Sequence, residues 1–145
     1  MNLSRSGKVT RVANAAVAGT GPLNSAAIDM SGDFSSVTFY VAFGTILQTA
    51  VVDVRAQGSS DGSTWADLAG TAVPVSDASS NFVAVLEVDE PIDRYIRAVV
   101  TREVADVVVD AVIAVQTRAK HEPVTHDTMS VAGSEYHHSP VQGTA

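Results

Sequence analysis

The chain has 145 residues and 15.0 kDa, with 9 Lys and Arg against 16 Asp and Glu, a formal net charge of −7 and a pI near 4.8. This length suits a single domain with one core. The excess of acid argues against a general nucleic-acid binder, because the nucleic acid carries the same sign of charge. The absence of cysteine excludes a disulfide scaffold, a thiolate nucleophile and a cysteine-ligated zinc or iron–sulfur site.

The composition favours a packed β protein. Hydrophobic residues make up 46% of the chain and charged residues only 17%, and 24 residues are valine. Valine is favoured in strands, and a chain so poor in charge does not resemble a disordered one.

Targeting and membrane segments are not evident in the sequence. The basic residues near the N-terminus are not followed by an apolar run of signal-peptide length. The most apolar stretch, residues 105–115, is interrupted by Asp106 and Asp110 and is too short to cross a bilayer. We therefore expect a chain made in the cytoplasm, without a signal peptide and without membrane contact.

The predicted elements begin with residues 1–22, which form either an N-terminal arm or an edge strand. Five segments then alternate apolar and polar residues with a period of two, which predicts strands. These segments are residues 36–43, 52–57, 82–89, 96–101 and 107–115. In the last segment, strict alternation places Val107, Val109, Ala111, Ile113 and Val115 on one face. Turn-rich breaks separate the segments, so we predict an all-β fold, an antiparallel β-sandwich or jelly roll, over residues 1–118.

The loop at residues 58–65 reads Gly-Ser-Ser-Asp-Gly-Ser-Thr-Trp. It predicts a hairpin turn, because Asp61-Gly62 readily adopts the positive φ angles of a type I′ turn. A calcium loop would need further alternating acids and a terminal glutamate, which this segment lacks. Trp65, the only tryptophan, is expected to begin the return strand half-buried; the alternative is a side chain that stacks on a sugar.

Residues 119–145 form an extended C-terminal tail without a periodic apolar face. This tail holds all four histidines, two prolines and only isolated apolar residues. A segment of this composition cannot build its own core. We expect it to lie on another surface, and we favour a neighbouring chain over its own domain.

Charge changes sign along the chain. The net charge is +3 over residues 1–28, −9 over 29–93, +2 over 94–120 and −3 over 121–145. Blocks of opposite sign favour the approach of neighbouring copies, and a solvated surface is the simpler interpretation of any single charge.

The predicted interface combines basic residues near the N-terminus with the histidines and isolated apolar residues of the tail. Its members are Arg5, Lys8, Arg11, His121, His126, Met129, Tyr136, His137 and His138. A metal site would pair His137 and His138 with His121 or Asp127, but zinc ligands stand on a rigid turn or helix, which this segment lacks. We therefore expect no metal and no cofactor. The histidines predict assembly that responds to pH around ~6.5.

The sequence shows no catalytic constellation. It has no Gly-x-Ser-x-Gly elbow, its histidines are confined to the tail, and Gly19-Thr-Gly21 lacks the spacing and the lysine of a phosphate loop. We expect a protein that is not an enzyme.

Two stretches carry a resemblance to a known family. Gln57–Leu68 is similar to a hairpin common in the β-sandwich virion proteins of tailed phages, and Pro91–Ala98 looks like the strand that often follows it, with Tyr95 and Arg97 at the matching places. With its small size and tail, the whole chain resembles small capsid decoration (cement) proteins. Extracellular carbohydrate-binding sandwiches carry similar pieces.

The resemblance implies a virion structural protein that binds the outside of a phage head and clamps neighbouring capsid subunits. Its implied partners are the major capsid protein and copies of itself, as a homotrimer, and its implied location is the virion. The alternatives are another virion component (a head–tail connector, or a tail- or fibre-associated protein), a carbohydrate-binding adhesion module that uses Trp65, and an enzyme with an unrecognised site.

Overall fold

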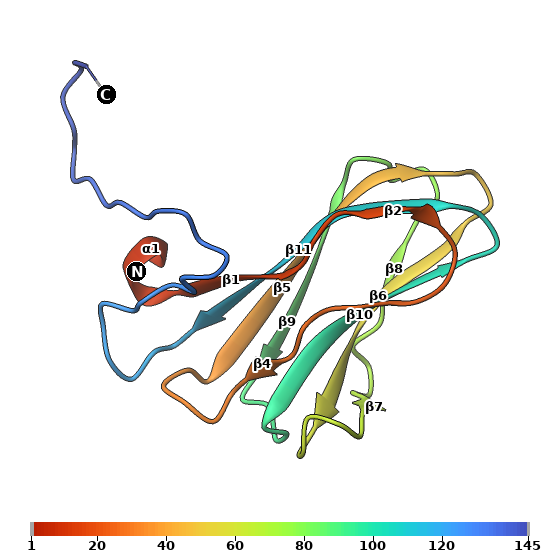
Figure 1. The fold of residues 1–145 in the computed structure, drawn as a ribbon, viewed down its shortest axis with the longest axis horizontal. Coiled ribbons are helices and arrows are strands. Elements are labelled where there is room, and N and C mark those ends of the chain that lie inside the picture. The colour runs from red at the N-terminus through yellow and green to blue at the C-terminus, as the bar shows by residue number, and fades with distance from the viewer. Residues whose placement is uncertain (1, 145) are drawn as a thin grey trace.

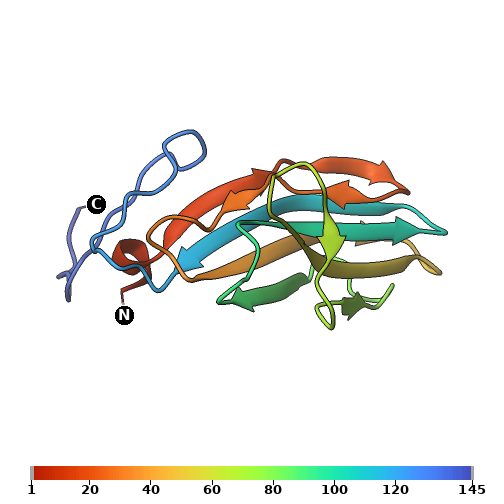
Figure 2. The ribbon, with the colours of Figure 1, turned by 90° about the horizontal axis from the view of Figure 1, so that it is seen from below.

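A computed structural model describes residues 2–144, and two antiparallel β-sheets pack face to face in it (Figure 1). The predicted all-β antiparallel sandwich is confirmed. The one helix in the described chain, α1 (Leu3–Ser6), is a single turn before the first strand. Figure 2 shows an elongated sandwich with both termini at the same end.

The five-stranded sheet has the order β1-β11-β5-β9, and β2 also pairs with β11. Its strands are β1 (Lys8–Ala13), β2 (Ala16–Gly19), β5 (Ser36–Ile46), β9 (Val83–Asp89) and β11 (Val107–Thr117). Residues 2–22 therefore contribute α1 and the two strands on one side of this sheet.

The six-stranded sheet has the order β3-β10-β6-β7, with β4 beside β10 and β8 beside β6. Its strands are β3 (Leu23–Asn24), β4 (Ile28–Asp29), β6 (Val51–Ser59), β7 (Ala66–Asp67), β8 (Val73–Val75) and β10 (Tyr95–Glu103). Only β6 and β10 are long, so this sheet ends in short strands on both sides.

The core lies between the sheets and is built from alternate residues of the long strands, as the period of two predicts. Fully buried aliphatic and aromatic side chains from both sheets form one contiguous cluster. Its centre includes Val37, Phe39, Val41, Val54, Ala56, Ile96, Ala98, Val112 and Ala114.

Strand β11 departs from the predicted strict alternation. Its register with β5 shifts between Val107 and Val109 and again between Val109 and Ala111. The residues that face the core are therefore Val107 and Val109 before the shifts and Val112 after them, whereas Ile113 is 37% exposed. The prediction of one apolar face from residue 107 to 115 is wrong beyond Val109, because bulges change which side of the sheet a residue faces.

The loop after β6 forms the predicted hairpin, since β7 pairs antiparallel with β6, but the type of its turn differs from the prediction. Gly62 has a positive φ of 75°, whereas Asp61 does not, so the turn is not type I′. Instead, Asp61 Oδ1 accepts hydrogen bonds from the backbone N–H groups of Ser63 and Thr64, both at 2.8 Å. These bonds lower the pKa of the Asp61 carboxyl below its usual range. The loop is closed by an Asp side chain rather than by backbone geometry alone.

An ion pair joins β4 to the start of β10. Arg94 donates from Nε and Nη2 to the two carboxylate oxygens of Asp29, at 3.1 and 2.8 Å, and Asp29 Oδ1 also accepts the N–H of Ser31 at 2.9 Å. The hydrogen bond from Arg94 and then those from Ser31 lower the pKa of Asp29. Both partners of the pair are about half exposed, so water screens it.

The Asp29 pair predicts a modest loss of stability in acid. A carboxyl whose pKa is lowered by folding stabilises the fold above its unfolded pKa of about 3.9, and that stabilisation disappears as the pH falls below this value. We expect thermal melts between about pH 5 and pH 3 to show a smaller loss of Tm in Asp29→Asn than in the wild type. Asp106→Asn, at an exposed carboxylate with no ion pair in the described chain, is the matched control and should follow the wild type. An unchanged acid response in Asp29→Asn would contradict this assignment.

Candidate interaction surface

The N-terminal helix, strand β1 and the C-terminal tail meet at one end of the sandwich (Figures 1 and 2). Strand β11 ends at Thr117, and residues 118–144 contain no further helix or strand in the described chain. The tail turns back and runs beside β1. We call residues 124–131 the docked segment and residues 132–144 the outer segment.

The docked segment covers the free edge of β1. Because β1 is the last strand of its sheet here, alternate backbone groups of β1 point away from β11 and need other partners. Val9 N–H donates to His126 Nδ1 at 3.1 Å, and Val9 carbonyl oxygen accepts the N–H of Asp127 at 3.2 Å. Arg11 N–H donates to Ser130 Oγ at 2.9 Å. The tail therefore satisfies an edge that would otherwise be open to another strand.

Further bonds hold the tail before and at the start of the docked segment, and one bond lies within it. Lys120 N–H donates to the carbonyl oxygen of Asp33, and Val124 N–H to that of Arg5, both at 2.8 Å. Asp127 Oδ2 accepts the hydroxyl of Ser130 at 2.5 Å. Hydrogen bonds to backbone groups of residues 4–11 hold the docked segment, and its His126 and Val131 line an apolar hollow together with Leu3 and Val9.

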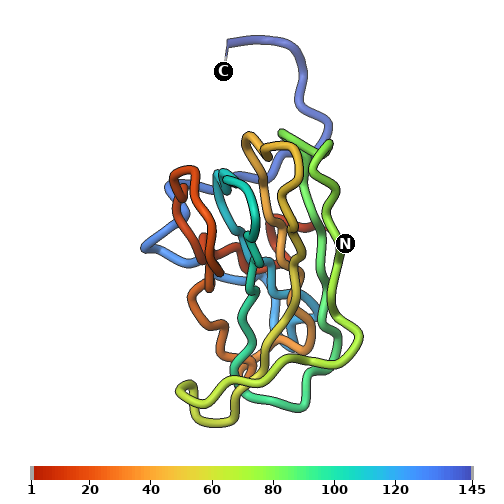
Figure 3. The backbone as a smooth tube through the Cα atoms, turned by 90° about the vertical axis from the view of Figure 1, so that its right-hand side faces the viewer, coloured from red at the N-terminus to blue at the C-terminus, as the bar shows by residue number. Residues whose placement is uncertain are grey.

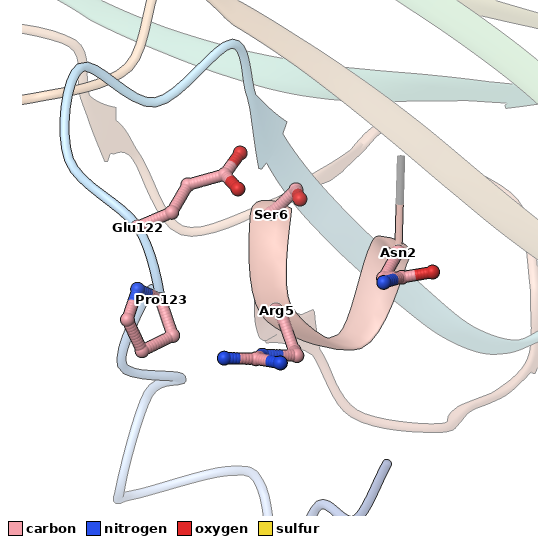
Figure 4. Close-up of a pocket in the computed structure, with 5 residues that line it drawn as sticks. All are labelled: Asn2, Arg5, Ser6, Glu122 and Pro123. Carbon is pink, nitrogen blue, oxygen red and sulfur yellow. The ribbon is translucent and has the colours of Figure 1, made fainter. Parts of the chain in front are cut away.

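Arg5 stands between two shallow hollows at this end. The first has a volume of about 360 Å³ and is lined by Asn2, Arg5, Ser6, Glu122 and Pro123. Figure 4 shows the Arg5 guanidinium extended toward the Pro123 ring, with the Glu122 carboxylate on the side of Ser6. The second hollow, about 530 Å³, adds tail residues including His126 and Tyr136.

The Arg5 guanidinium has an aromatic partner and no acidic one in the described chain. Its carbon lies 5.5 Å from the centroid of the Tyr136 ring, and no carboxylate of residues 2–144 lies within ion-pair distance of it. A cation above an aromatic ring is a weak attraction at an exposed site. The protein is acidic overall, and the Arg5 guanidinium is a positive charge on it that is able to pair with an acidic group of another molecule.

The structure brings some of the predicted interface residues together and leaves others apart. Arg5, His126 and Tyr136 share one hollow. Arg11 directs its guanidinium to backbone carbonyl groups of Ala13 and Asp110, and Met129 is 91% exposed. The remaining four are separate: Lys8 begins β1, His121 Nδ1 lies 3.2 Å from Asp33, His137 Nε2 lies 2.9 Å from Glu135, and His138 is exposed.

The predicted histidines do not converge on a metal. Within residues 2–144 no group of three or more His, Asp and Glu side chains is placed to hold an ion. The same part of the chain has no helix long and apolar enough to cross a membrane.

His126 joins the docked segment to both α1 and β1. Its Nδ1 accepts from Val9 N–H, so that nitrogen carries no proton, and its Nε2 lies 3.0 Å from the carbonyl oxygen of Ser4 and 3.1 Å from Ser134 Oγ. Both ring nitrogens are therefore used in the contact between the docked segment and the N-terminal residues.

We expect the amide of Val9 to lose protection when His126 is replaced by alanine, because its N–H then loses its acceptor in the tail. Losing one hydrogen bond of about 1 kcal/mol corresponds to a roughly fivefold lower protection factor. Amide exchange followed by NMR at a fixed pH measures this. The matched control is His121→Ala, which should leave the protection of Val9 unchanged. Equal protection of Val9 in the wild type and in His126→Ala would contradict the contact.

A second polar cluster lies on the outer face of the six-stranded sheet. The Arg97 guanidinium lies 4.3 Å from the centroid of the Trp65 ring, and Arg97 Nε and Nη2 both donate to Gln57 Oε1, at 2.9 and 2.7 Å. Gln57 in turn donates to Asp67 at 2.7 Å. Partial burial lowers the pKa of Arg97. One face of Trp65 is therefore occupied by the chain's own Arg97, which leaves less of the ring to stack on a sugar.

Sequence reasoning missed the residues that dock the tail. Asp127 and Ser130 contact β1 through the tail backbone and a hydroxyl group, and neither belongs to a recognisable motif. The only signal was that they lie in a polar segment without a periodic face of its own.

Comparison with known proteins supports the fold. The protein has the architecture of a two-sheet antiparallel sandwich, and neither a protein-family model nor a curated protein matches the chain. Among solved structures, it is similar to the PBSX exported protein XepA, with 17% sequence identity and a TM-score of 0.56. The match covers 94% of this chain and 45% of XepA, so the chain spans less than half the length of that protein. At this identity the likeness shows a shared fold.

Proposed function

We propose that the chain is a non-enzymatic structural protein of a phage virion, and that it decorates the outside of the head. The observation that carries the proposal is the tail, which docks on β1 by a few hydrogen bonds and then continues outward. Two further points support it: the similarity of Gln57–Leu68 and Pro91–Ala98 to phage virion sandwiches, and the fold shared with the PBSX exported protein XepA.

The outer segment is suited to contact another molecule. All of residues 132–144 are exposed, and they include Tyr136 at 44% and Val141 at 92% exposure. Fully extended, these 13 residues span roughly 40 Å. An arm tethered to a folded domain binds a neighbour with a high effective concentration, so weak contacts are sufficient. This is the action expected of a protein that clamps subunits of a lattice.

In this proposal the partners are the major capsid protein and further copies of the chain, arranged as a homotrimer. Arg5, Lys8 and Arg11 provide positive charge at the end of the sandwich from which the tail leaves, and residues 121–145 provide the negative charge. Such charges guide the approach of partners more than they strengthen the final contact. We expect binding to weaken as the salt concentration rises.

The test is the position of the protein on particles. Virions of the phage or prophage that encodes the chain would be purified on a density gradient and separated into heads and tails, and the chain would be quantified in each fraction by mass spectrometry. The proposal predicts the chain in the head fraction and its release from intact heads by a protease that leaves the capsid uncut. Recovery in the tail fraction would overturn decoration in favour of another virion component. Absence from both fractions would overturn the virion assignment.

A further inference from the structure

Strand β9 is the one long open edge of the sandwich within residues 2–144. The five-stranded sheet ends at β9, which has seven residues. Its opposite edge consists of β1, which the docked segment covers, and of β2, which has only four residues. The edge strands of the other sheet are only two or three residues long, and β8 contains Pro74, which has no N–H to offer. Short strands and prolines are common means of protecting an edge, and β9 has neither.

The backbone groups that β9 presents to the open side can be assigned. Phe43 N–H donates to the carbonyl oxygen of Phe82 at 3.0 Å, and Glu90 N–H to that of Ser35 at 2.8 Å, at the two ends of the β5–β9 ladder. In an antiparallel ladder alternate residues bond to the same neighbour. Even-numbered residues of β9 therefore bond to β5, and the N–H and C=O groups of Val83, Val85 and Glu87 point to the open side.

The same edge is apolar. Phe82, Val83 and Val85 are 63%, 57% and 52% exposed. Beside them, a hollow of about 300 Å³ is lined mainly by apolar side chains of β8, β9 and neighbouring residues, including Val73 and Phe82. Figure 3 shows the green part of the chain, which contains β8 and β9, along one outer side of the molecule. Exposed apolar surface next to unpaired strand backbone is what an added strand covers.

We propose that β9 pairs with β9 of a second copy, antiparallel and across a twofold axis, so that the two five-stranded sheets become one continuous sheet. An isologous contact needs a surface that is complementary to itself. With Ala84 on the axis, Val83 lies opposite the partner's Val85 and Val85 opposite the partner's Val83. Glu87 then lies beyond the partner's Val83, where the partner's chain has left the strand at Asn81, which has a positive φ of 65°.

The charge of Glu87 favours this register over those in which the twofold axis is moved along β9. Moving the axis from Ala84 to Val85 places Glu87 opposite the partner's Val83. Moving it to Glu87 places two carboxylates opposite each other, and like charges directly across a ladder are destabilising. The acidic end of the strand, Glu87 to Glu90, therefore excludes pairing centred there and leaves the valine pair as the contact. The inference does not depend on the proposed function.

The first test is the oligomeric state of the full chain. Sedimentation velocity of the wild type should show a dimer that dissociates on dilution, or a hexamer where the proposed homotrimer also forms. Val85→Lys should shift the protein toward half that mass, because each lysine faces the partner's Val83 and lies diagonal to a second copy of its own charge. Val17→Lys is the matched control: Val17 is 86% exposed in β2 and should tolerate the change without altering the mass. Circular dichroism confirms that both variants are folded.

The second test determines the register of the two β9 strands. The chain has no cysteine, so a single substitution reports one contact. In the proposed register Ala84 forms a non-hydrogen-bonded pair with the partner's Ala84, with Cα atoms about 4.5 Å apart, within the range of a disulfide. Ala84→Cys should form a covalent dimer under mild oxidation, and Glu87→Cys should not. A wild type that is monomeric at every concentration, a mass unaffected by Val85→Lys, or cross-linking by Glu87→Cys but not by Ala84→Cys would each overturn the proposal.

Discussion

Replacing Phe39 by alanine is expected to lower the free energy of unfolding by about 3 to 5 kcal/mol. Phe39 is fully buried, and it lies on β5, the strand that is flanked by β9 and β11. It pairs with Leu86 on one side and Ala114 on the other, so its removal leaves a cavity that ordered strands on both sides cannot close. For a domain of ordinary stability this loss is a large share of the total.

Urea unfolding at fixed pH, followed by circular dichroism, measures the change. The matched control is the next residue, Tyr40→Ala, whose side chain is on the opposite face and 37% exposed. We expect its effect to stay below about 2 kcal/mol, because much less area leaves water on folding. Equal losses in the two variants would contradict the assignment of Phe39 to the core between the sheets.

Deleting residues 119–145 is expected to leave the sandwich folded and to abolish retention on particles. The hydrophobic core is contributed by residues up to Ala114, so the deletion removes no member of it. The deletion does remove the groups that bond to Val9 and Arg11, together with the whole outer segment. If the tail is the clamp, binding to heads should fall at least about 100-fold, which corresponds to about 2.7 kcal/mol.

Co-sedimentation with particles that lack the chain measures retention, and circular dichroism checks the fold. A second variant deletes only residues 132–145, so that the docked segment still covers β1. It should remain as stable as the wild type and should also fail to be retained. Normal retention of this shorter deletion would contradict the role of the outer segment. Normal retention of both deletions would show that the sandwich itself carries binding.

Most of the sandwich could be predicted from the sequence because side-chain direction in a strand follows from spacing alone. Alternation placed Val37, Phe39, Val41 and Phe43 together, and all four are buried on β5. In β11 the same rule failed, because a bulge near Asp110 changes the face without any signal in residue type. Phe82 was assigned to strand 82–89, but β9 begins at Val83 and Phe82 is 63% exposed at its end.

The candidate interaction surface was less predictable, since it depends on contacts between residues far apart in sequence. The basic residues near the N-terminus and the polar tail were both identified from the sequence. The hydrogen bond that His126 accepts from the N–H of Val9, 117 positions away, was not predicted. The acceptor is a ring nitrogen and the donor is a backbone amide, and neither leaves a pattern in composition. The tail was favoured to lie on a neighbouring chain. The structure places its docked segment on its own domain, and the contact of its outer segment with a neighbour stays a prediction.

In the proposed function, the outer segment of the tail joins the sandwich to neighbouring subunits on a phage head. An electron cryo-microscopy map of heads that carry the protein tests it most directly. The proposal predicts density for a two-sheet sandwich on the outer surface, with the outer segment crossing onto an adjacent capsid subunit or another copy of the chain. A map in which residues 132–144 contact only their own sandwich, or in which no sandwich lies on the head surface, would contradict it.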